Sequence, residues 1–402
     1  MEKKKRMVHY NDYWNYYSDD FDWPNDYYPP NLEKTRQIYS DLGLQTAEAE
    51  ALISSGYVNM HGDIIIDRYY GGPLASSDLA TRIHKDYFPE WYRMAKSGET
   101  SRRDVFLNTA KSFDELTRQV NKIQASLGQK LLFRGQIMHY ETTRSIRNPY
   151  LLIEGLGETS LIPSIWRNLL QKKPQSFHHF NGLNLLEWSK IIYSQFDIEE
   201  VERRVKELIK RGEWIYSAQD MEDSDDPLVS LFGRVRLDLS MGKNHNLADL
   251  LNTLLQHYGL FSPYLDLSSD LRVAMFFASH RFVPNTGNNH YQFVGSNGSK
   301  SILYLFKHKQ NEMAEYAHDR VLHDLQPLRP KRQSCVVCRS SPYALNLAGL
   351  YLVGAIRIDF ELPESERLSA PELFPNEHED NFLAALIGNC MHPERVTTFL
   401  HR

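Results

Sequence analysis

Irregular alternation of strand-like and helix-like segments is the feature that most constrains the fold. Apolar runs predict strands at residues 131–136 (LLFRGQ), 301–306 (SILYLF), 334–338 (SCVVC) and 351–360 (YLVGAIRIDF). Helical patterns lie between these runs at unequal intervals, and the sequence contains neither an internal repeat nor a regular series of βαβ units. This order favours an α+β fold over a doubly wound parallel sheet.

Composition and periodicity divide the chain into three parts. Residues 1–30 are an acidic, aromatic arm, because positions 10–30 are rich in Tyr, Trp, Phe and Asp and contain no Lys or Arg. Aromatic residues this dense rarely stay in water, so we expect the arm to pack on its own chain, on a partner protein or on an inhibitor. We expect residues 31–125 to be mainly helical, and residues 126–402 to form one domain with a helical insertion at about 170–245.

Three local patterns make sharper predictions. Ser112 is placed to cap a helix, with Glu115 three residues later as the second member of a capping box. Apolar residues recur at helical spacing through residues 198–212, which predicts an amphipathic helix with a solvated charged face. Residues 283–300 (VPNTGNNHYQFVGSNGSK) are predicted to form a flexible polar loop.

Bulk properties narrow the class of protein. The 402 residues include 46 Lys and Arg against 51 Asp and Glu, so no global basic field attracts nucleic acid, although a local basic groove stays open. Three cysteines make no disulfide framework in a chain this long, which suits a reducing compartment. The sequence has no apolar run of membrane-spanning length and no signal peptide. We therefore expect a soluble, cytoplasmic protein without membrane partners.

Common catalytic and metal-binding motifs are missing from the sequence. Cys335 and Cys338 are spaced CxxC, but residues three apart in a strand face opposite sides, so we expect two core cysteines and no metal. No HExxH, GxSxG, Walker loop or GxGxxG occurs. An ordinary NTPase, a dinucleotide-binding enzyme of the doubly wound class and a serine hydrolase are therefore disfavoured.

Three segments carry the polar residues that most resemble a site. Arg134 ends an apolar strand, and arginine is rarely buried without a partner, so it marks either a strand exit or an anion site. Gln333 enters the strand at 334–338. Between them, residues 254–278 place five hydrogen-bonding side chains between an apolar helix end and an apolar helix start, as an orienting site requires: His257, Tyr258, Asp266, Ser268 and Ser269. Structural alternatives stay open, in which Arg134 pairs with Asp266 and Ser268 caps the following helix.

Taken together, these segments resemble the FRG domain family. The resemblance rests on FRGQ, then LIPSIWR, then LLQHYG, YLDLSS and VAMFFA, then RPKRQ and ELFP, and it runs from Leu131 to about Gly388. Two departures change the pattern. Phe261-Ser262-Pro263 stands where the family commonly has Pro-Thr-Arg, and Asp266-Leu267-Ser268 stands where it usually has Asp-Trp-Thr. Each keeps a hydroxyl, and the first loses a basic residue.

The layout is further similar to the ADP-ribosyltransferase fold, which implies a split β-sheet core with helical insertions and a mainly helical N-terminal extension. On that resemblance Arg134, Ser268 and Gln333 occupy the Arg, Ser/Thr and Glu places of the arginine class, with NAD as substrate and no metal. Arginine is suited to gripping a diphosphate or ribose, and Ser268 would fix the nicotinamide ribose. Because Gln333 is no carboxylate, Asp266 would supply the charge that stabilises an oxocarbenium-like species.

The remaining residues implied for NAD binding flank these positions. They are Gly135 and Gln136 after the arginine, and His257 and Tyr258, which would stack on or hydrogen-bond the nicotinamide. Gly135 is expected to let the chain turn away close to the ligand. The function implied is an NAD-consuming ADP-ribosyltransferase or NAD glycohydrolase, of toxin or phage-defence type, that modifies a protein or nucleic-acid target. A catalytically silent FRG module that binds a nucleotide or partner protein is the alternative, and a nucleic-acid-binding factor is the second alternative.

Overall fold

The computed structural model describes residues 31–61, 64–67, 69–70, 83–84, 87–163, 185–241, 253–254, 256–259, 264–284, 289–309, 313–315, 326–338, 346–389 and 396–399. The acidic arm expected at residues 1–30 lies outside the described residues. So do residues 164–184, where the helical insertion is expected to begin, and residues 261–263, where the chain departs from the family pattern.

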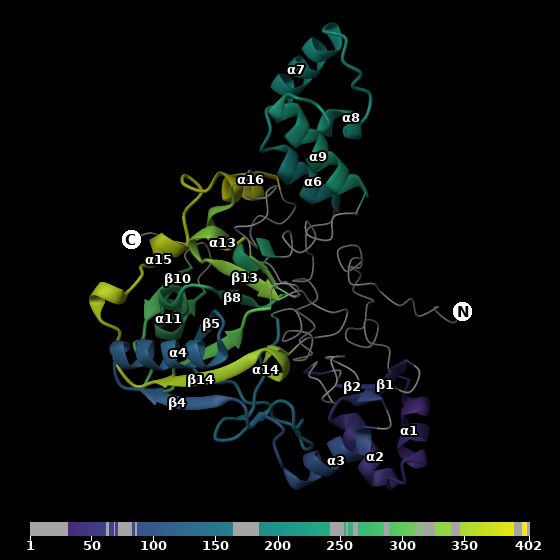
Figure 1. Ribbon diagram of the computed structural model, residues 1–402, viewed down its shortest axis with the longest axis vertical. Helices are drawn as coiled ribbons and strands as arrows, with labels where there is room; N and C mark the ends of the chain where they lie inside the picture. The colour runs from purple at the N-terminus through teal and green to yellow at the C-terminus, as the bar shows by residue number, and fades with distance from the viewer. Residues whose placement is uncertain are drawn as a thin grey trace.

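A mixed seven-stranded sheet forms the centre of the molecule (Figure 1), in the order β12-β13-β8-β5-β11-β14-β4. Neighbouring strands run antiparallel except β14 and β4, which are parallel. The strands are β4 (Phe106–Ala110), β5 (Leu131–Gln136), β8 (Asp266–Ser268), β11 (Ile302–Lys307), β12 (Met313–Glu315), β13 (Cys335–Cys338) and β14 (Leu352–Ile358). All four strands predicted from the sequence are present, and β5 has the predicted bounds.

Each face of the sheet has its own apolar cluster. On one face, α4 (Phe113–Leu127) and α11 (Leu271–Ser279) pack on alternate residues of β5, β11 and β14. On the other face, residues 151–161 and α14 (Leu347–Leu350) cover Leu132, Tyr304 and Phe306. Alternation along β5 therefore sends Leu131 and Phe133 into the first cluster and Leu132 into the second.

Helix ends follow the expected capping chemistry only in part. Ser112 caps α4 as predicted, because its side chain accepts from the amide of Glu115. The Glu115 carboxylate, however, accepts from the Lys111 amide, so the predicted capping box is not closed. Asp270, and not Ser268, caps α11 through a bond from the Arg272 amide. The structural alternative for Ser268 as the helix cap is therefore wrong.

The N-terminal elements form a unit with a separate apolar core (Figure 1). Its elements are α1 (Leu32–Asp41), α2 (Thr46–Ser54), β1 (Tyr57–His61), β2 (Ile64–Asp67), β3 (Ile83–His84) and α3 (Phe88–Ser97). Tyr39, Tyr57, Phe88 and Trp91 are fully buried in its core. Of the next two elements, β4 is an edge strand of the central sheet, and α4 packs in the apolar cluster on one face of that sheet.

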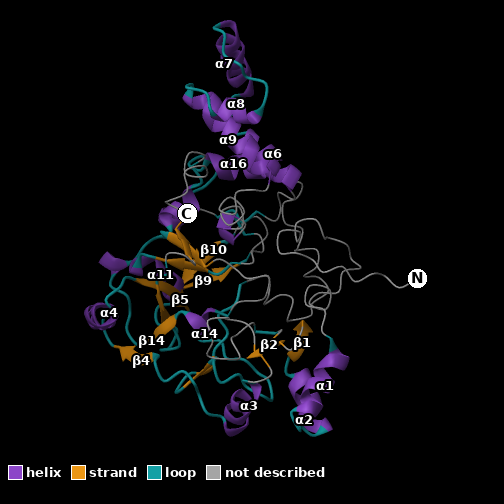
Figure 2. Cartoon of the chain, turned by 45° about the vertical axis from the view of Figure 1, so that its right-hand side comes forward, coloured by secondary structure: helices purple, strands orange, loops and turns teal. Residues whose placement is uncertain are grey.

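Four helices stand out from the sheet as a projection (Figure 2). They are α6 (Leu185–Tyr193), α7 (Ile198–Lys210), α8 (Ala218–Glu222) and α9 (Pro227–Met241). The amphipathic helix predicted at residues 198–212 is α7, with Asp197 as its cap and Val201 and Leu208 buried. These helices lie within the range of about 170–245 in which the sequence predicts a helical insertion.

The remaining elements are short. They are β6 (Leu152–Ile153), β7 (Gly157–Glu158), β9 (His280–Val283), β10 (His290–Phe293), α13 (Leu328–Arg332), η4 (Glu364–Glu366), α15 (Ala370–Leu373) and α16 (Asn381–Asn389). Strands β9 and β10 pair antiparallel, with Tyr291 opposite Phe282. The prediction of a polar loop throughout residues 283–300 is therefore wrong at β10. Ring contacts of Tyr291 with Phe276 and Phe374 hold this strand in place.

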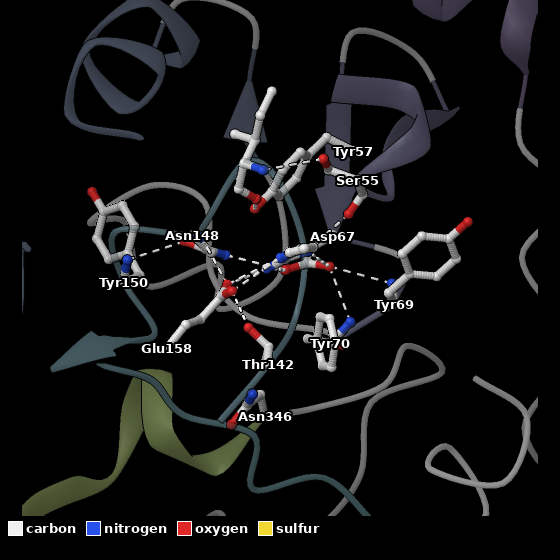
Figure 3. Close-up of polar contacts among 12 residues, drawn as sticks. Ser55, Tyr57, Asp67, Tyr69, Tyr70, Thr142, Asn148, Tyr150, Glu158 and Asn346 are labelled. Atoms are coloured by element: carbon white, nitrogen blue, oxygen red, sulfur yellow. Dashed lines mark hydrogen bonds and ion pairs between the residues drawn. The ribbon is translucent and has the colours of Figure 1, made fainter. Parts of the chain in front are cut away.

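A buried ion cluster joins the N-terminal unit to the chain that follows β5 (Figure 3). Arg144 donates to both carboxylate oxygens of Asp67, at 2.9 and 2.6 Å, and also bonds Glu158. Both carboxylates are fully buried. The guanidinium lies 4.7 Å from the ring centres of Tyr57 and Tyr70. Asn148 completes the cluster by donating its backbone amide to Glu158 and its side-chain amide to Asp67.

Candidate functional site

A cavity of about 810 Å³ opens where β5 and β8 separate. The two strands pair at Phe133 and Ser268, and their register records no further pair. Seven of the eight residues predicted for the site line this cavity: Arg134, Gly135, Gln136, His257, Asp266, Ser268 and Gln333. The volume lies within the range of about 300–1,000 Å³ that is usual for small-molecule sites.

Arg134 and Asp266 connect the two separated strands. Nη1 of Arg134 donates to the backbone oxygen of Asp266 at 2.7 Å and lies 3.3 Å from its carboxylate. Both side chains keep some exposure, 16% for Arg134 and 20% for Asp266. Nε of Arg134 is buried and has no hydrogen-bond partner among the described residues. Arg134 therefore combines the two roles that the sequence left open, because it pairs with Asp266 and also faces a cavity.

Asp266 is held as a carboxylate. Burial acts to raise the pKa of its carboxyl group, but the positive charge of Arg134 and the hydrogen bonds from Arg134 and the backbone outweigh burial, and the pKa is lowered from its usual value. The carboxylate thus stays ionised at neutral pH. It places a negative charge on the wall of the cavity, close to Arg134.

His257 is a neutral imidazole in the cavity wall. Burial is the main cause that lowers its pKa to about 4, with a further contribution from Arg329, while Asp266 and a hydrogen bond with the Gln333 side chain act in the opposite direction. Only 6% of the residue is exposed. Its Nε2 atom is buried without a hydrogen-bond partner among the described residues. A neutral ring with one unsatisfied nitrogen is suited to hydrogen-bonding a ligand.

Ser268 and Gln333 line the cavity but are largely occupied by the protein. The Ser268 hydroxyl donates to the backbone oxygen of Gln333 at 2.8 Å and accepts from the amide of Asp270. The Gln333 side-chain amide donates to the backbone oxygen of Leu373 at 3.2 Å. Gln333 ends α13 and precedes β13, so it lies just outside the strand that the sequence predicts it to enter. These contacts leave Ser268 little capacity to bind a ligand directly.

Tyr258 does not line the cavity, contrary to its predicted role in NAD binding. Its hydroxyl donates to the Asp380 carboxylate at 2.5 Å, and its ring packs on Phe382. The Arg329 guanidinium lies 4.8 Å from the ring centre. Although His257 and Tyr258 are adjacent in sequence, His257 lines the cavity and Tyr258 contacts Asp380 and Phe382.

Gly135 is required for packing and not for a chain turn. A Cβ atom at this position would lie 1.7 Å from the backbone oxygen of Ala274 and 2.7 Å from the amide nitrogen of Ala278. The missing side chain therefore lets α11 lie directly on β5, a different reason from the one expected. Gln136, two residues after Arg134, presents a buried Oε1 atom that has no partner among the described residues.

The sequence did not reveal the aromatic wall of the cavity. Its rings come from distant segments: Phe277, Phe282, Tyr291, Phe374 and Phe399. Tyr291 stacks on Phe374 at 4.9 Å and on Phe399 at 5.5 Å. ELFP contained Phe374 as a motif residue, but no local pattern links it to Tyr291 or Phe399. Half of the cavity is thus polar and charged, and the other half offers flat apolar rings.

Cys335 and Cys338 are both buried in β13, as predicted. Among the described residues, no group of three or more His, Cys, Asp or Glu is arranged to hold a metal ion. Nor does any helix in the described part of the chain have the length and apolar character needed to cross a membrane. No family model, no curated protein sequence and no solved structure matches this chain.

Proposed function

We propose that the cavity between β5 and β8 binds NAD and that the chain is an NAD-consuming enzyme of the ADP-ribosyltransferase type, built on an FRG-like domain. The observation that carries this proposal is the convergence of Arg134, Ser268 and Gln333 on one cavity. They come from β5, from β8 and from the end of α13 two residues before β13, and the three strands are neighbours in the sheet. The target is a protein or nucleic acid, in a toxin or phage-defence role.

The residues of the cavity suit the chemical groups of NAD. Arg134 offers a cation to the diphosphate, since guanidinium groups form charge-assisted bonds with phosphate oxygens. The rings around Tyr291 offer stacking surfaces to a planar base. Oε1 of Gln136 is an acceptor that lacks a partner among the described residues, and Nε2 of His257 is an imidazole nitrogen in the same condition. Both match the hydroxyl or amide groups of NAD.

Asp266 takes the electrostatic role in the proposed reaction. The glycosidic bond between the ribose carbon and nicotinamide breaks, and the nitrogen of neutral nicotinamide keeps the electron pair. A nucleophile of the target or water then bonds to the same carbon and loses a proton to solvent. The ribose is cationic between these events, and a fixed carboxylate lowers the energy of that state. Asp266 is ionised and lines the cavity, whereas Gln333 carries no charge.

A second candidate function is nucleotide binding without turnover. The contacts of Ser268 with Gln333 and Asp270, and of Gln333 with Leu373, favour it. Two of the three residues that correspond to the transferase pattern are thereby engaged within the protein. In this alternative the same cavity holds NAD or a related nucleotide, and a partner protein recognises the nucleotide-bound form of the chain.

The test measures binding and turnover separately. Purified protein is titrated with NAD by calorimetry, and nicotinamide release and label transfer to lysate proteins or nucleic acid are followed. Wild type and Arg272→Ala, an exposed arginine on α11 outside the cavity, should bind alike, and Arg134→Ala should lose binding. Binding without nicotinamide release selects the second candidate. Neither binding nor release by wild type, with Arg134→Ala indistinguishable, rejects both.

A further inference from the structure

We propose that Gln136 is a specificity-determining residue of the cavity: its side-chain amide pairs with the carboxamide of the nicotinamide ring of NAD. The inference rests on the proposed function in taking NAD as the ligand. It goes beyond that function by giving the chain a means to distinguish NAD from a dinucleotide whose carboxamide has become a carboxylate.

Gln136 lies on the same face of β5 as Arg134. Residues two apart in a strand face the same way, and Gly135 between them packs on α11. Arg134 and Gln136 therefore both face away from that helix, and both line the cavity. Strand β8 pairs with β5 at Phe133 and at no described residue beyond it, so β8 does not pair with β5 beside Gln136.

The protein leaves the amide oxygen of Gln136 without a donor. Oε1 is buried and has no hydrogen-bond partner among the described residues. Its neighbours on β11 give the reason, because Ile302 stands directly opposite Gln136 and is apolar. Tyr304, opposite Arg134, has its hydroxyl 2.7 Å from Nδ1 of His139. Buried amide oxygens in proteins usually have a partner, so this oxygen favours a donor that arrives with the ligand.

The backbone that carries Gln136 is fixed on both sides of the residue. Gln136 pairs with Ile302 in the ladder between β5 and β11. The backbone oxygen of Ile137, the next residue, accepts from the side-chain amide of Asn297 at 2.8 Å. A polar group presented from a fixed strand loses little conformational entropy when a ligand binds.

A carboxamide is complementary to a second carboxamide. The oxygen of the Gln136 amide accepts and its nitrogen donates, so it can form two bonds with a group in which N–H₂ lies beside an acceptor. Nicotinamide carries such a group. The amino edge of adenine offers the same donor and acceptor. The nicotinamide end is the one expected here, because Arg134 on the same face bonds Asp266, the residue proposed to stabilise the ribose that carries nicotinamide.

The test measures dissociation constants by calorimetry for three ligands. They are NAD, nicotinic acid adenine dinucleotide, which has a carboxylate in place of the carboxamide, and ADP-ribose, which keeps adenine and lacks nicotinamide. Wild type should bind NAD at least about tenfold more tightly than the acid analogue, because a carboxylate only accepts hydrogen bonds and gives Oε1 of Gln136 no donor.

The variant Gln136→Met keeps the approximate size of the side chain and removes its amide. It should bind NAD about tenfold more weakly than wild type, the effect of one hydrogen bond. Its affinities for the acid analogue and for ADP-ribose should not change. Gln292→Met, the same substitution at an exposed position of β10 outside the cavity, is the matched control and should behave as wild type.

The ligand-free chain supplies an independent measurement. Gln136→Met removes a buried oxygen that lacks a partner, so its thermal midpoint should equal or exceed that of wild type. A lower midpoint, unchanged NAD affinity in Gln136→Met, or equal weakening for all three ligands would each overturn the inference. If NAD binds and Gln136→Met leaves its affinity unchanged, only the role of Gln136 falls. If wild type binds none of the three ligands, the proposed function falls and the role of Gln136 with it.

Discussion

Arg134 and Asp266 face each other at the point where β5 and β8 stop pairing. One nitrogen of the guanidinium bonds both the backbone oxygen and the carboxylate of Asp266, while Nε of the same group has no partner among the described residues. The pair thus links the two strands and still presents part of the arginine to the cavity. Because Arg134 has both a structural partner and a face toward the cavity, substitutions that keep its charge and substitutions that remove it should differ in their effects on stability and on ligand binding.

Arg134→Ala should destabilise the fold and abolish NAD binding, whereas Arg134→Lys should affect mainly binding. Without the guanidinium, the Asp266 carboxylate loses its counter-ion and a hydrogen-bond donor, a loss of about 1–3 kcal/mol in the free energy of unfolding. Lysine keeps the positive charge but not the planar fork. Urea unfolding and calorimetric titration with NAD measure the two effects. Equal affinity of Arg134→Lys and wild type would show that the fork does not contact the ligand.

Asp266→Asn should lower the rate of nicotinamide release more than it weakens NAD binding. The substitution keeps the shape of the side chain and the backbone oxygen that bonds Arg134, but removes the charge proposed to stabilise the cationic ribose. We expect kcat to fall at least about tenfold with a smaller change in KM, the mark of an interaction made in the transition state. An unchanged kcat in the asparagine variant would remove Asp266 from the mechanism.

His257 should make the fold less stable in mild acid. Its pKa is about 4 in the folded chain against 6.5 for the free side chain, so only the unfolded chain takes up the proton between these values. Stability is therefore fully present above pH 6.5 and falls as the pH drops toward 4, by about 3 kcal/mol in all. His257→Gln should remove this part of the slope. Urea unfolding across this pH range tests it, and parallel curves for the two proteins would contradict it.

Gly135→Ala should destabilise the chain through the contact of β5 with α11. The added methyl group would meet backbone atoms of Ala274 and Ala278, which cannot rotate away, so the helix must shift. Overpacking of this kind costs about 1–3 kcal/mol. Gly388→Ala in α16 is the matched control, because a Cβ atom there meets nothing within 4 Å. Thermal unfolding should lower the midpoint for the first variant and leave or raise it for the second.

Arg144→Met should be the most damaging single change in the ion cluster. It leaves Asp67 and Glu158 buried without their counter-ion, and losing one partner of a buried ion pair costs about 3–5 kcal/mol. Asp67→Asn should cost less, because Arg144 keeps Glu158. Arg203→Met, on the exposed face of α7, should change little. The order of urea midpoints checks this, and a milder effect of Arg144→Met than of Asp67→Asn would contradict it.

Local sequence patterns predicted the elements well and their partners poorly. The apolar run that leads into Arg134 was enough to give β5 its bounds, and capping chemistry was enough to place Ser112 at the start of α4. The sequence also named most of the polar half of the cavity, since Arg134, His257 and Asp266 are unusual residues in apolar surroundings. Tyr258 shows the limit of that reasoning, because it has the same neighbours in sequence as His257 but bonds Asp380, far along the chain.

Long-range packing decided what local patterns left open. Tyr291, Phe374 and Phe399 form one wall although two long intervals of chain separate them, and no periodicity relates them. Strand β10 lay within a segment rich in Asn and Gly, where turn composition outweighed the signal of its aromatic residues. The ion cluster could not be predicted from the sequence either, because Asp67, Arg144 and Glu158 each resemble ordinary surface residues in their sequence context.

The ion cluster has a consequence for the cavity at the other end of the same stretch of chain. Residues 137–143 leave the sheet at Gln136, pass Ile137 and Tyr140 in the cavity lining, and reach Arg144 in the cluster. A guanidinium shared by two carboxylates accepts only one orientation, so this span is tethered at both ends. A displacement of the N-terminal unit would therefore be transmitted through residues 137–143 to the cavity lining. The helical projection is not connected to the cavity through these residues.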